Sequence, residues 1–327
     1  MAISIDDIKK LRAMTGAGLA DVKKALTEAE GDFDKAKELL RERGLAIAAK
    51  RSDRETSNGC VLVKAVDGFA ATLALKCETD FVANGADFIA LTQAVLDAAI
   101  AAQAKTLDEV KELTLADGQK VQDAVTQRSG ITGEKMELDG YLTLEGDNIE
   151  VYDHMAKHTL CTMVQTNKEN AEAGHKVAMQ VAAMKPVALN AEQVDQKVLD
   201  EEYNTAVEKT KLEQVEKYVE VVLKKAGINP NLVDSEDHIA SNINKGWLTE
   251  DQAKEARELK EKAATLNPNM IENIAKGRVQ KFLKENCLVD QEFQFGDGDK
   301  ATVAQWLKAQ DKELEIVAFR RFTLVAE

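Results

Sequence analysis

Cysteine is scarce in this sequence of 327 residues, which contains only four: Cys60, Cys77, Cys161 and Cys287. They lie far apart, and no two form the Cys-x-x-Cys pair that zinc knuckles and dithiol redox sites use. The sequence therefore predicts neither kind of site. We expect four free and mostly packed thiols, because free cysteine is among the most frequently buried residue types.

Long apolar runs are also missing. A helix needs about 20 apolar residues to cross a bilayer, and even the alanine-rich stretch 94–104 is short and contains Asp97. Residues 1–10 mix acidic and basic side chains with short apolar ones, unlike the apolar stretch of a signal peptide. We therefore expect a soluble, cytoplasmic protein.

No local catalytic motif is present. The four histidines, His154, His158, His175 and His238, form no His-Glu-x-x-His arrangement, and no serine or cysteine lies in a nucleophile elbow. The segment 15–18 is glycine-rich, but no Gly-Lys-Ser/Thr follows it, so it predicts a helix connection. The sequence thus assigns no catalytic, cofactor-binding or metal-binding residue and predicts a protein that is not an enzyme. A hydrolase site assembled from distant residues stays open as an alternative.

Basic residues are outnumbered by acidic ones, 43 to 57, which gives a formal net charge of −14. This excess opposes attraction to phosphate backbones and to anionic lipid surfaces. We expect a folded protein as the partner, with no direct binding of nucleic acid or membrane. The length and the 44% hydrophobic composition favour two or three domains.

Three short helical patterns follow one another near the amino terminus. The apolar residues of each recur at spacings of three and four, which places them on one stripe of a helix. Glycine-containing segments at 15–18 and 30–32 separate the helices, and Gly44 is a suitable stop after the third. The sequence predicts a three-helix domain at 1–45, followed by a polar linker at 46–57.

An α+β core is predicted after the linker. Two β patterns between 60 and 77 flank Asp67-Gly68, a dipeptide that suits a tight hairpin turn. Thr79 can cap the next helix, with Gly85 as a short interruption. A similar order returns from Thr159 onward, so we interpret the core as two related halves, each with an antiparallel sheet and helices. The amino-terminal half is placed at 58–140 and the carboxyl-terminal half at 141–190 and 287–327.

A helical region at 191–286 interrupts the second half of this predicted core. Residues 191–226 form a long charged amphipathic pattern that Gly227–Pro230 must end, since proline lacks the amide donor. Further helical patterns fill 249–286, with a break at Asn267-Pro268. Because the apolar stripes are narrow, we expect these helices to pack on one another as a protruding, antiparallel coiled-coil hairpin.

The segment Thr79-Asp80-Phe81-Val82 places a bulky aromatic beside a carboxylate at the predicted strand-to-helix junction. In one interpretation Thr79 or Asp80 caps the helix, and Phe81 packs into the core as a hydrophobic staple. In the other, Phe81 points outward as an aromatic anchor, and Asp80 offers charged hydrogen-bond acceptors beside it. Periodicity alone does not decide between the two.

Several blocks of the sequence form a specific set: Leu11–Gly18 with Lys23–Leu26 and Gly31-Asp32, Cys77–Ala83, Met179–Pro186, and Gly277–Phe282. These blocks resemble the elongation factor Ts family, the guanine-nucleotide exchange factors of elongation factor Tu. They occur in the family's order and span nearly the whole chain, and the first two together are highly specific.

The resemblance implies a ubiquitin-associated-like three-helix domain, a two-part core and a protruding coiled coil. It also implies that the amino-terminal domain and Thr79–Val82 engage the G domain of elongation factor Tu, while the other half of the core grips its third domain. Phe81 would then act as a wedge that dislodges Mg²⁺, so that GDP leaves and GTP can bind. The partner-binding residues carried over from the family are Thr79, Asp80, Phe81 and Val82, and further Leu11, Arg12, Gly16, Leu19 and His154.

Between about Glu208 and Leu266 the chain carries more residues than a family member of common length. These residues could add a partner surface, stabilise a homodimer or lengthen a solvated arm, and we favour the arm. A different class of function is a non-enzymatic scaffold, whose three-helix domain binds a ubiquitin-like or unfolded chain. Recovery of elongation factor Tu from lysate, with binding reversed by GTP, would separate an exchange factor from a scaffold.

Overall fold

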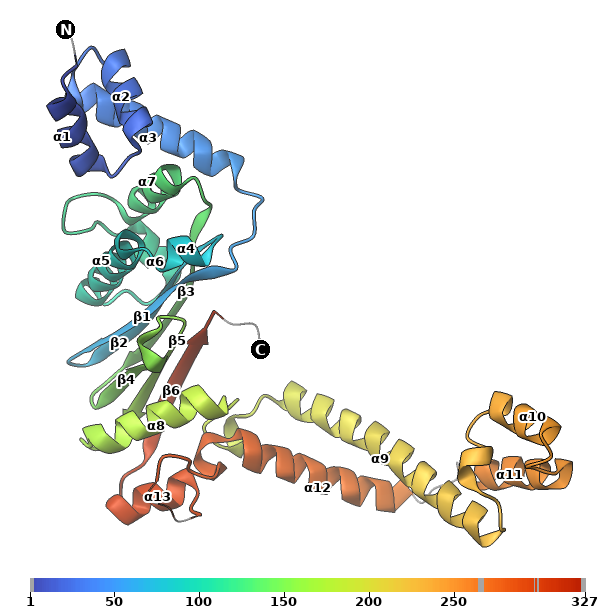
Figure 1. Ribbon diagram of the computed structural model, residues 1–327. Coiled ribbons are helices and arrows are strands. Elements are labelled where there is room, and N and C mark those ends of the chain that lie inside the picture. Colours follow the sequence, from blue (N-terminus) through green and yellow to red (C-terminus); the bar gives the residue numbers. More distant parts are fainter. Residues whose placement is uncertain (1–2, 264–267, 297, 299, 325–327) are drawn as a thin grey trace. The chain divides into compact units, whose positions relative to one another are not determined.

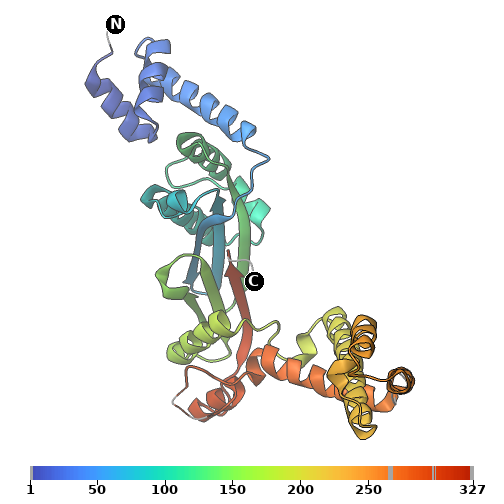
Figure 2. The ribbon, with the colours of Figure 1, turned by 45° about the vertical axis from the view of Figure 1, so that its right-hand side comes forward.

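The protein forms two compact units in a computed structural model that describes residues 3–263, 268–296, 298 and 300–324 (Figures 1 and 2). The first unit combines Met1–Lys185 with Glu292–Glu327, and the second is Pro186–Gln291. The first unit contains two three-stranded antiparallel sheets together with helices. The predicted α+β class is confirmed.

Three helices begin the first unit: α1 (Ile5–Thr15), α2 (Leu19–Glu28) and α3 (Phe33–Lys50). The Ser4 hydroxyl caps α1 in a capping box, and the Asp32 carboxylate caps α3 by accepting two backbone hydrogen bonds. The apolar stripes of the three helices meet in one buried cluster. The apolar stripes predicted for the three helices therefore face one another.

The third helix does not end at Gly44, as the sequence analysis predicted, but continues to Lys50. The first residues of the predicted linker 46–57 are consequently helical. Gly44 lies where α3 crosses α7 (Val121–Thr132), and a Cβ added to Gly130 would stand 2.2 Å from the Gly44 Cα. The glycine thus permits a close helix crossing. It is not a stop signal here.

The first sheet has the order β1-β2-β3, formed by β1 (Asn58–Val66), β2 (Phe69–Cys77) and β3 (Met136–Glu145). Gly68, with φ at +77°, turns β1 into β2 as the Asp-Gly pair predicted. The predicted boundary between the two halves of the core, between 140 and 141, falls inside β3. Gly140 lies at a β-bulge of this strand, and the strand continues beyond it. The division of the chain into domains otherwise stays a prediction.

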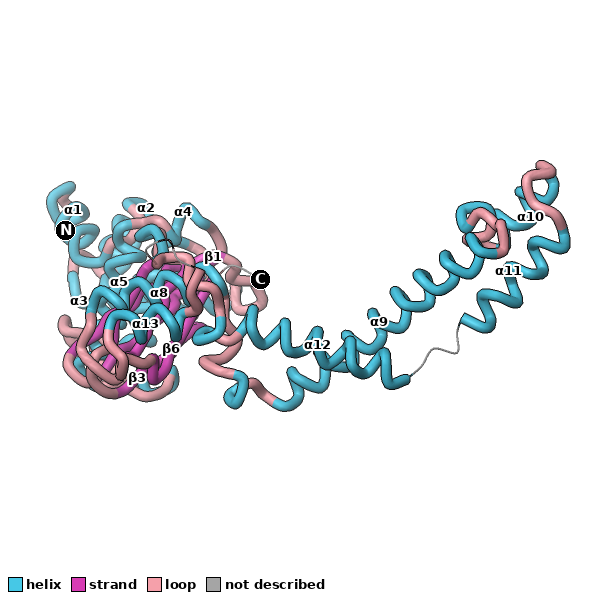
Figure 3. The backbone as a smooth tube through the Cα atoms, turned by 90° about the horizontal axis from the view of Figure 1, so that it is seen from below, coloured by secondary structure: helices cyan, strands magenta, loops and turns pink. Residues whose placement is uncertain are grey.

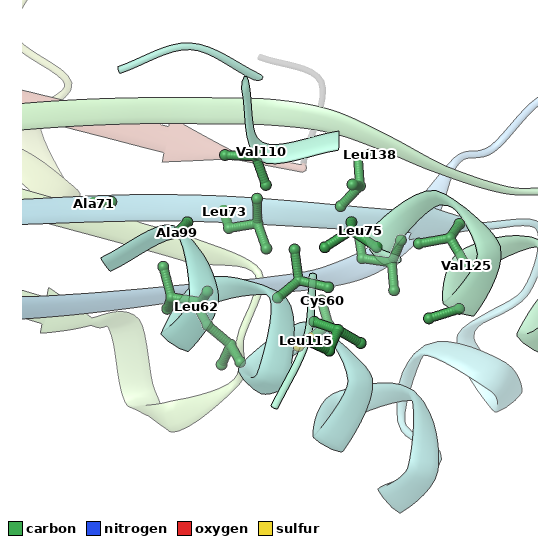
Figure 4. Close-up of a cluster of buried hydrophobic side chains, with 14 of the residues drawn as sticks. Cys60, Leu62, Ala71, Leu73, Leu75, Ala99, Val110, Leu115, Val125 and Leu138 are labelled. Atoms are coloured by element: carbon green, nitrogen blue, oxygen red, sulfur yellow. The ribbon is translucent and has the colours of Figure 1, made fainter. Parts of the chain in front are cut away.

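Helices cover one face of this sheet: α4 (Asp80–Ala83), α5 (Ala86–Ala102), α6 (Leu107–Glu112) and α7. Alternate strand residues point toward these helices, as the two-residue period of a strand requires. Figure 4 shows the resulting cluster, in which strand side chains meet helix side chains. Among them are Leu62, Leu73, Leu75, Ala99, Val110 and Val125.

The second sheet has the order β4-β5-β6, formed by β4 (Ile149–Asp153), β5 (Leu160–Thr166) and β6 (Ile316–Thr323). The helix α8 (Ala171–Met184) packs on β4 and β5, and α13 (Val303–Gln310) precedes β6. Two smaller buried clusters join the sheets face to face. They contain Val61, Ala74 and Cys161 in one case, and Ala70, Leu144 and Met163 in the other.

The second unit is helical, with α9 (Gln196–Lys225) packed against α12 (Pro268–Asn286) (Figure 3). Leu199 lies in a cluster with Leu283, and Arg278 pairs with Glu213 at 2.5 Å, so the two helices run antiparallel. The predicted break at Asn267-Pro268 lies partly outside the described residues, since 264–267 are not described and α12 begins at Pro268. Short 3₁₀ turns at Ala191–Gln193, Pro230–Leu232 and Leu288–Asp290 complete the unit.

Part of the extra segment at 208–266 forms a small helical subdomain, and whether it serves as an arm, a partner surface or a dimer contact stays a prediction. The carboxyl end of α9 folds together with α10 (Glu236–Asn244) and α11 (Glu250–Ala263) around a core of its own. Apolar residues of the three helices and of the connections between them supply this core. The core consists of Leu223, Ile228, Val233, Ile239, Leu248, Ala253 and Ala256.

Candidate functional site: the turn that carries Phe81

The Thr79–Val82 segment occupies the junction between β2 and α5. Thr79 has extended backbone angles, φ −123° and ψ 154°, and its hydroxyl accepts a hydrogen bond from the Val82 N–H at 3.4 Å. The N-cap predicted at Thr79 is therefore confirmed. Phe81, however, is 87% exposed. The interpretation in which Phe81 packs into the core as a staple is wrong.

The outward direction of Phe81 follows from the single helical turn that carries it. Ala83 is buried, and Val82 packs against the main core cluster. Successive helical residues point about 100° apart, so a turn that directs these two side chains inward leaves Phe81 facing solvent. An aromatic side chain buries roughly 150–250 Å² when it is covered. The exposed ring of Phe81 therefore presents a large apolar area that a partner could cover.

The chain reverses sharply after α4. The Gly85 N–H donates to the Val82 carbonyl at 2.9 Å, and a Cβ added to Gly85 would stand 3.0 Å from that oxygen. The Asn84 side chain donates to the Asp80 carbonyl at 2.8 Å. The interruption predicted at Gly85 is confirmed, and the turn that presents Phe81 is short and internally bonded.

A surface hollow of about 730 Å³ lies beside Phe81. In its wall, Arg128 pairs with Asp87 at 3.1 Å, and Asp80 is exposed. The hollow thus combines an aromatic ring and a guanidinium, side-chain types that are enriched at protein-binding surfaces, with two carboxylates. Its wall consists of Asp80, Phe81, Val82, Asn84, Gly85, Ala86, Asp87, Phe88, Arg128 and Thr132.

Two glutamates hold the residues before α4 against the start of β3. The Glu134 carboxylate accepts hydrogen bonds from the N–H groups of Glu78 and Thr79, at 3.2 and 3.1 Å, and from the Thr79 hydroxyl at 2.6 Å. The Glu78 carboxylate accepts the Lys135 N–H at 2.6 Å and pairs with Arg51 at 2.9 Å. The Lys135 hydrogen bond, and after it Arg51, lowers the pKa of Glu78. The sequence analysis missed these residues because no local pattern links 134 to 79.

The amino-terminal candidates differ in exposure. Leu11 is fully buried in the cluster of the three helices, because it belongs to the apolar stripe of α1. The prediction that Leu11 itself contacts a partner is therefore wrong, and its role is packing. Arg12 and Gly16 are exposed, and Leu19 is 58% exposed. Met14, which the sequence analysis did not single out, is 54% exposed between them.

His154 begins a tight connection between β4 and β5. It is half-buried, and its Nδ1 lies 3.2 Å from the Tyr152 hydroxyl. Three other residues of this connection, Met155, Ala156 and His158, have φ between 52° and 57°. Left-handed backbone is uncommon outside glycine and is concentrated at functional sites. The structure thus keeps Thr79–Val82 together on one turn and places His154 on a different, strained one.

Other kinds of site find no support in the described part of the chain. Over 3–263, 268–296, 298 and 300–324, no group of three or more His, Cys, Asp or Glu side chains could hold a metal ion. No helix within these residues is long and apolar enough to cross a membrane. The four cysteines are free and buried, as predicted.

Comparison with known proteins gives one consistent result. A family model described as "Elongation factor TS" matches residues 78–326. The chain is 57% identical over 332 residues to the elongation factor Ts of Parabacteroides distasonis and 58% identical over 332 residues to that of Phocaeicola vulgatus. It is 57% identical over 333 residues to that of Bacteroides fragilis strain YCH46, and each alignment covers 100% of both chains. The resemblance found in the sequence is confirmed, and the chain belongs to the elongation factor Ts family of translation elongation factors.

Proposed function

We propose that this chain binds elongation factor Tu in its GDP-bound form and promotes release of GDP and Mg²⁺, so that GTP can bind. Phe81 acts as the wedge that enters the G domain. The observation that carries the proposal is the 87% exposure of Phe81 on a turn closed by its own hydrogen bonds. A large apolar ring held in water on a short, bonded turn is preorganised for burial by a partner.

Exchange of this kind needs no bond chemistry. A factor that binds the nucleotide-free partner better than the nucleotide-bound one must, by reciprocity, weaken nucleotide binding to the same extent. Truncating a buried aromatic anchor costs about 2 kcal/mol or more, which corresponds to roughly thirtyfold in an equilibrium constant. A single ring can therefore account for a substantial part of the coupling between the two sites.

The remaining expectations complete the proposal. Thr79, Asp80 and Val82 support Phe81, while Arg12, Gly16, Leu19 and His154 make further contacts with the partner. The chain acts in the cytoplasm without a cofactor or an enzymatic step, and without direct binding of nucleic acid or membrane. The ubiquitin-associated-like character of the first three helices, the coiled-coil character of the helix pair and a possible homodimer belong to the same proposal.

Stopped-flow release of fluorescent GDP from elongation factor Tu tests the wedge. We expect the wild-type chain to accelerate release and Phe81→Ala to lose roughly thirtyfold of that acceleration at subsaturating concentration. Leu212→Ala is the matched control, because Leu212 is also a large exposed apolar residue, at 66%, but lies on α9. Equal acceleration by wild type and Phe81→Ala would remove Phe81 from the mechanism. If this chain binds elongation factor Tu and GTP does not reverse the binding, the alternative of a non-enzymatic scaffold is favoured.

A further inference from the structure

The hydrogen-bonded ladder between β2 and β3 ends at the pair Cys77 and Met136. Beyond that pair, carboxylates take the place of backbone carbonyls. Glu134 accepts the N–H groups of Glu78 and Thr79, and Glu78 accepts the N–H of Lys135. The two chain segments therefore remain bonded to each other up to the first residue of the Phe81 turn.

Glu134 is itself held in place by the end of α7. Gly133 ends this helix in the left-handed region, with φ at +71°. The Ser129 hydroxyl donates to the Glu134 carbonyl at 2.5 Å, and the Glu134 N–H donates to the Thr132 hydroxyl at 3.3 Å. The backbone of Glu134 is thus bonded on both sides, so its half-buried carboxylate is directed by a rigid helix end.

The Thr79 hydroxyl connects Glu134 to the turn. A hydroxyl has one proton to donate and lone pairs to accept with. Because Thr79 donates its proton to Glu134 at 2.6 Å, a lone pair remains for the Val82 N–H at 3.4 Å. The charged acceptor thereby fixes the orientation of the N-cap, and hydrogen bonds to a charged group are stronger than neutral ones.

From this geometry we infer that Glu134 is a positioning residue for nucleotide exchange: its carboxylate orients the Thr79 cap and so fixes the direction in which Phe81 points. The inference rests on the proposed function. Glu134 does not have to touch the partner to act, since it works through Thr79. Its removal leaves two backbone N–H groups and one hydroxyl without their acceptor, and the turn is then free to sample other directions.

Two substitutions separate positioning from folding. Glu134→Ala removes both oxygens, whereas Glu134→Gln keeps the shape and one acceptor oxygen. Asp139→Asn is the matched control, because Asp139 is a carboxylate of β3 that pairs with Lys76 and makes no bond to the turn. We expect Glu134→Ala to reduce the acceleration of GDP release about tenfold, Glu134→Gln less, and Asp139→Asn by less than about twofold.

A double-mutant cycle with Phe81→Ala gives a readout that a merely structural role would not change. If Glu134 acts through Phe81, Glu134→Ala has almost no further effect once the ring is absent, so the two losses are not additive. Additive losses would overturn the inference. Hydrogen exchange of the peptide 78–85, measured by mass spectrometry in the free chain, should rise in both Glu134 variants while the peptides of β1 stay protected.

The same experiments distinguish the inference from the function on which it rests. If the wild-type chain does not accelerate GDP release, the proposed function fails, and the positioning role fails with it. If the wild-type chain accelerates release and Phe81→Ala does not, but Glu134→Ala performs like wild type, only the positioning role is overturned. Unchanged exchange of the peptide 78–85 in Glu134→Ala would also overturn it.

Discussion

The guanidinium of Arg51 lies 2.9 Å from the carboxylate of Glu78. Arg51 directly follows α3, and Glu78 directly precedes Thr79, so this ion pair joins the exit of the three amino-terminal helices to the entrance of the Phe81 turn. Both side chains are partly covered, with 36% and 16% exposure. Exposed ion pairs contribute about 0–1 kcal/mol, and the partial covering of this pair reduces its screening by salt.

The Arg51 pair and the Lys135 N–H predict a dependence of stability on pH. Both lower the pKa of Glu78 from its ordinary value of 4.5. A carboxyl whose folded-state pKa is depressed stabilises the fold fully above the ordinary value, and this contribution is lost as pH falls from there through the lower folded-state pKa. We expect Glu78→Gln to be less stable than wild type at pH 7, and the difference to shrink below about pH 4.5.

Tryptophan fluorescence can follow this difference in the first unit alone. Of the two tryptophans, Trp306 is buried at 8% exposure in the first unit, and Trp247 is 64% exposed in the second. In a Trp247→Phe background, urea unfolding therefore reports on Trp306. Glu145→Gln, which removes an exposed carboxylate paired with Lys105, serves as the control. A difference between Glu78→Gln and wild type that stays constant from pH 7 to pH 3 would contradict the prediction.

The crossing of α3 and α7 predicts a strong effect of a single methyl group. A Cβ added to Gly130 would stand 2.2 Å from the Gly44 Cα, a backbone atom that cannot rotate away. We expect Gly130→Ala to force the helices apart and to cost about 1–3 kcal/mol, the usual range for overpacking. Hydrogen exchange of the α3 peptides should rise accordingly.

Gly277→Ala is the matched control for that substitution. Gly277 also lies inside a helix, α12, but a Cβ there would meet no atom within 4 Å. Replacing an unhindered helical glycine by alanine stabilises a helix by roughly 0.5–1 kcal/mol. Opposite signs for the two variants are expected, whereas a neutral Gly130→Ala would show that α3 and α7 can separate without loss.

Local signals predicted the parts of the fold that depend on neighbouring residues. Asp67-Gly68 predicted the hairpin, and Thr79 and Gly85 predicted the cap and the interruption around α4. The end of α3 was predicted wrongly, because Gly44 is needed for contact with α7, far along the chain. The sequence alone does not show whether a single glycine ends a helix or allows close contact between two helices.

The candidate site was predictable in its position but not in its geometry. The exposure of Phe81 depends on Val82 and Ala83 facing the core, and that burial is set by β1 and β2 together. Glu134 is brought to Thr79 by the pairing of β3 with β2, far apart in the sequence, so neither spacing nor composition points to it. Leu11 shows the converse case, since its apolar stripe already predicted the burial that the structure shows.

Buried thiols lead to the last prediction. Burial raises the pKa of Cys60 and of Cys77 to about 12, and it also raises the pKa values of Cys161 and Cys287. The thiolate is the reactive form of cysteine, and a raised pKa reduces the fraction of thiolate at pH 8. We expect the native chain to react very slowly with a thiol-specific aromatic disulfide and all four thiols to react promptly in denaturant.

Cysteine introduced at the exposed position 212, as Leu212→Cys, should react promptly in the folded chain, because that side chain is 66% exposed. Rapid reaction of a native thiol would reveal local opening of the structure around that cysteine, and its rate relative to the introduced cysteine would measure the free energy of that opening.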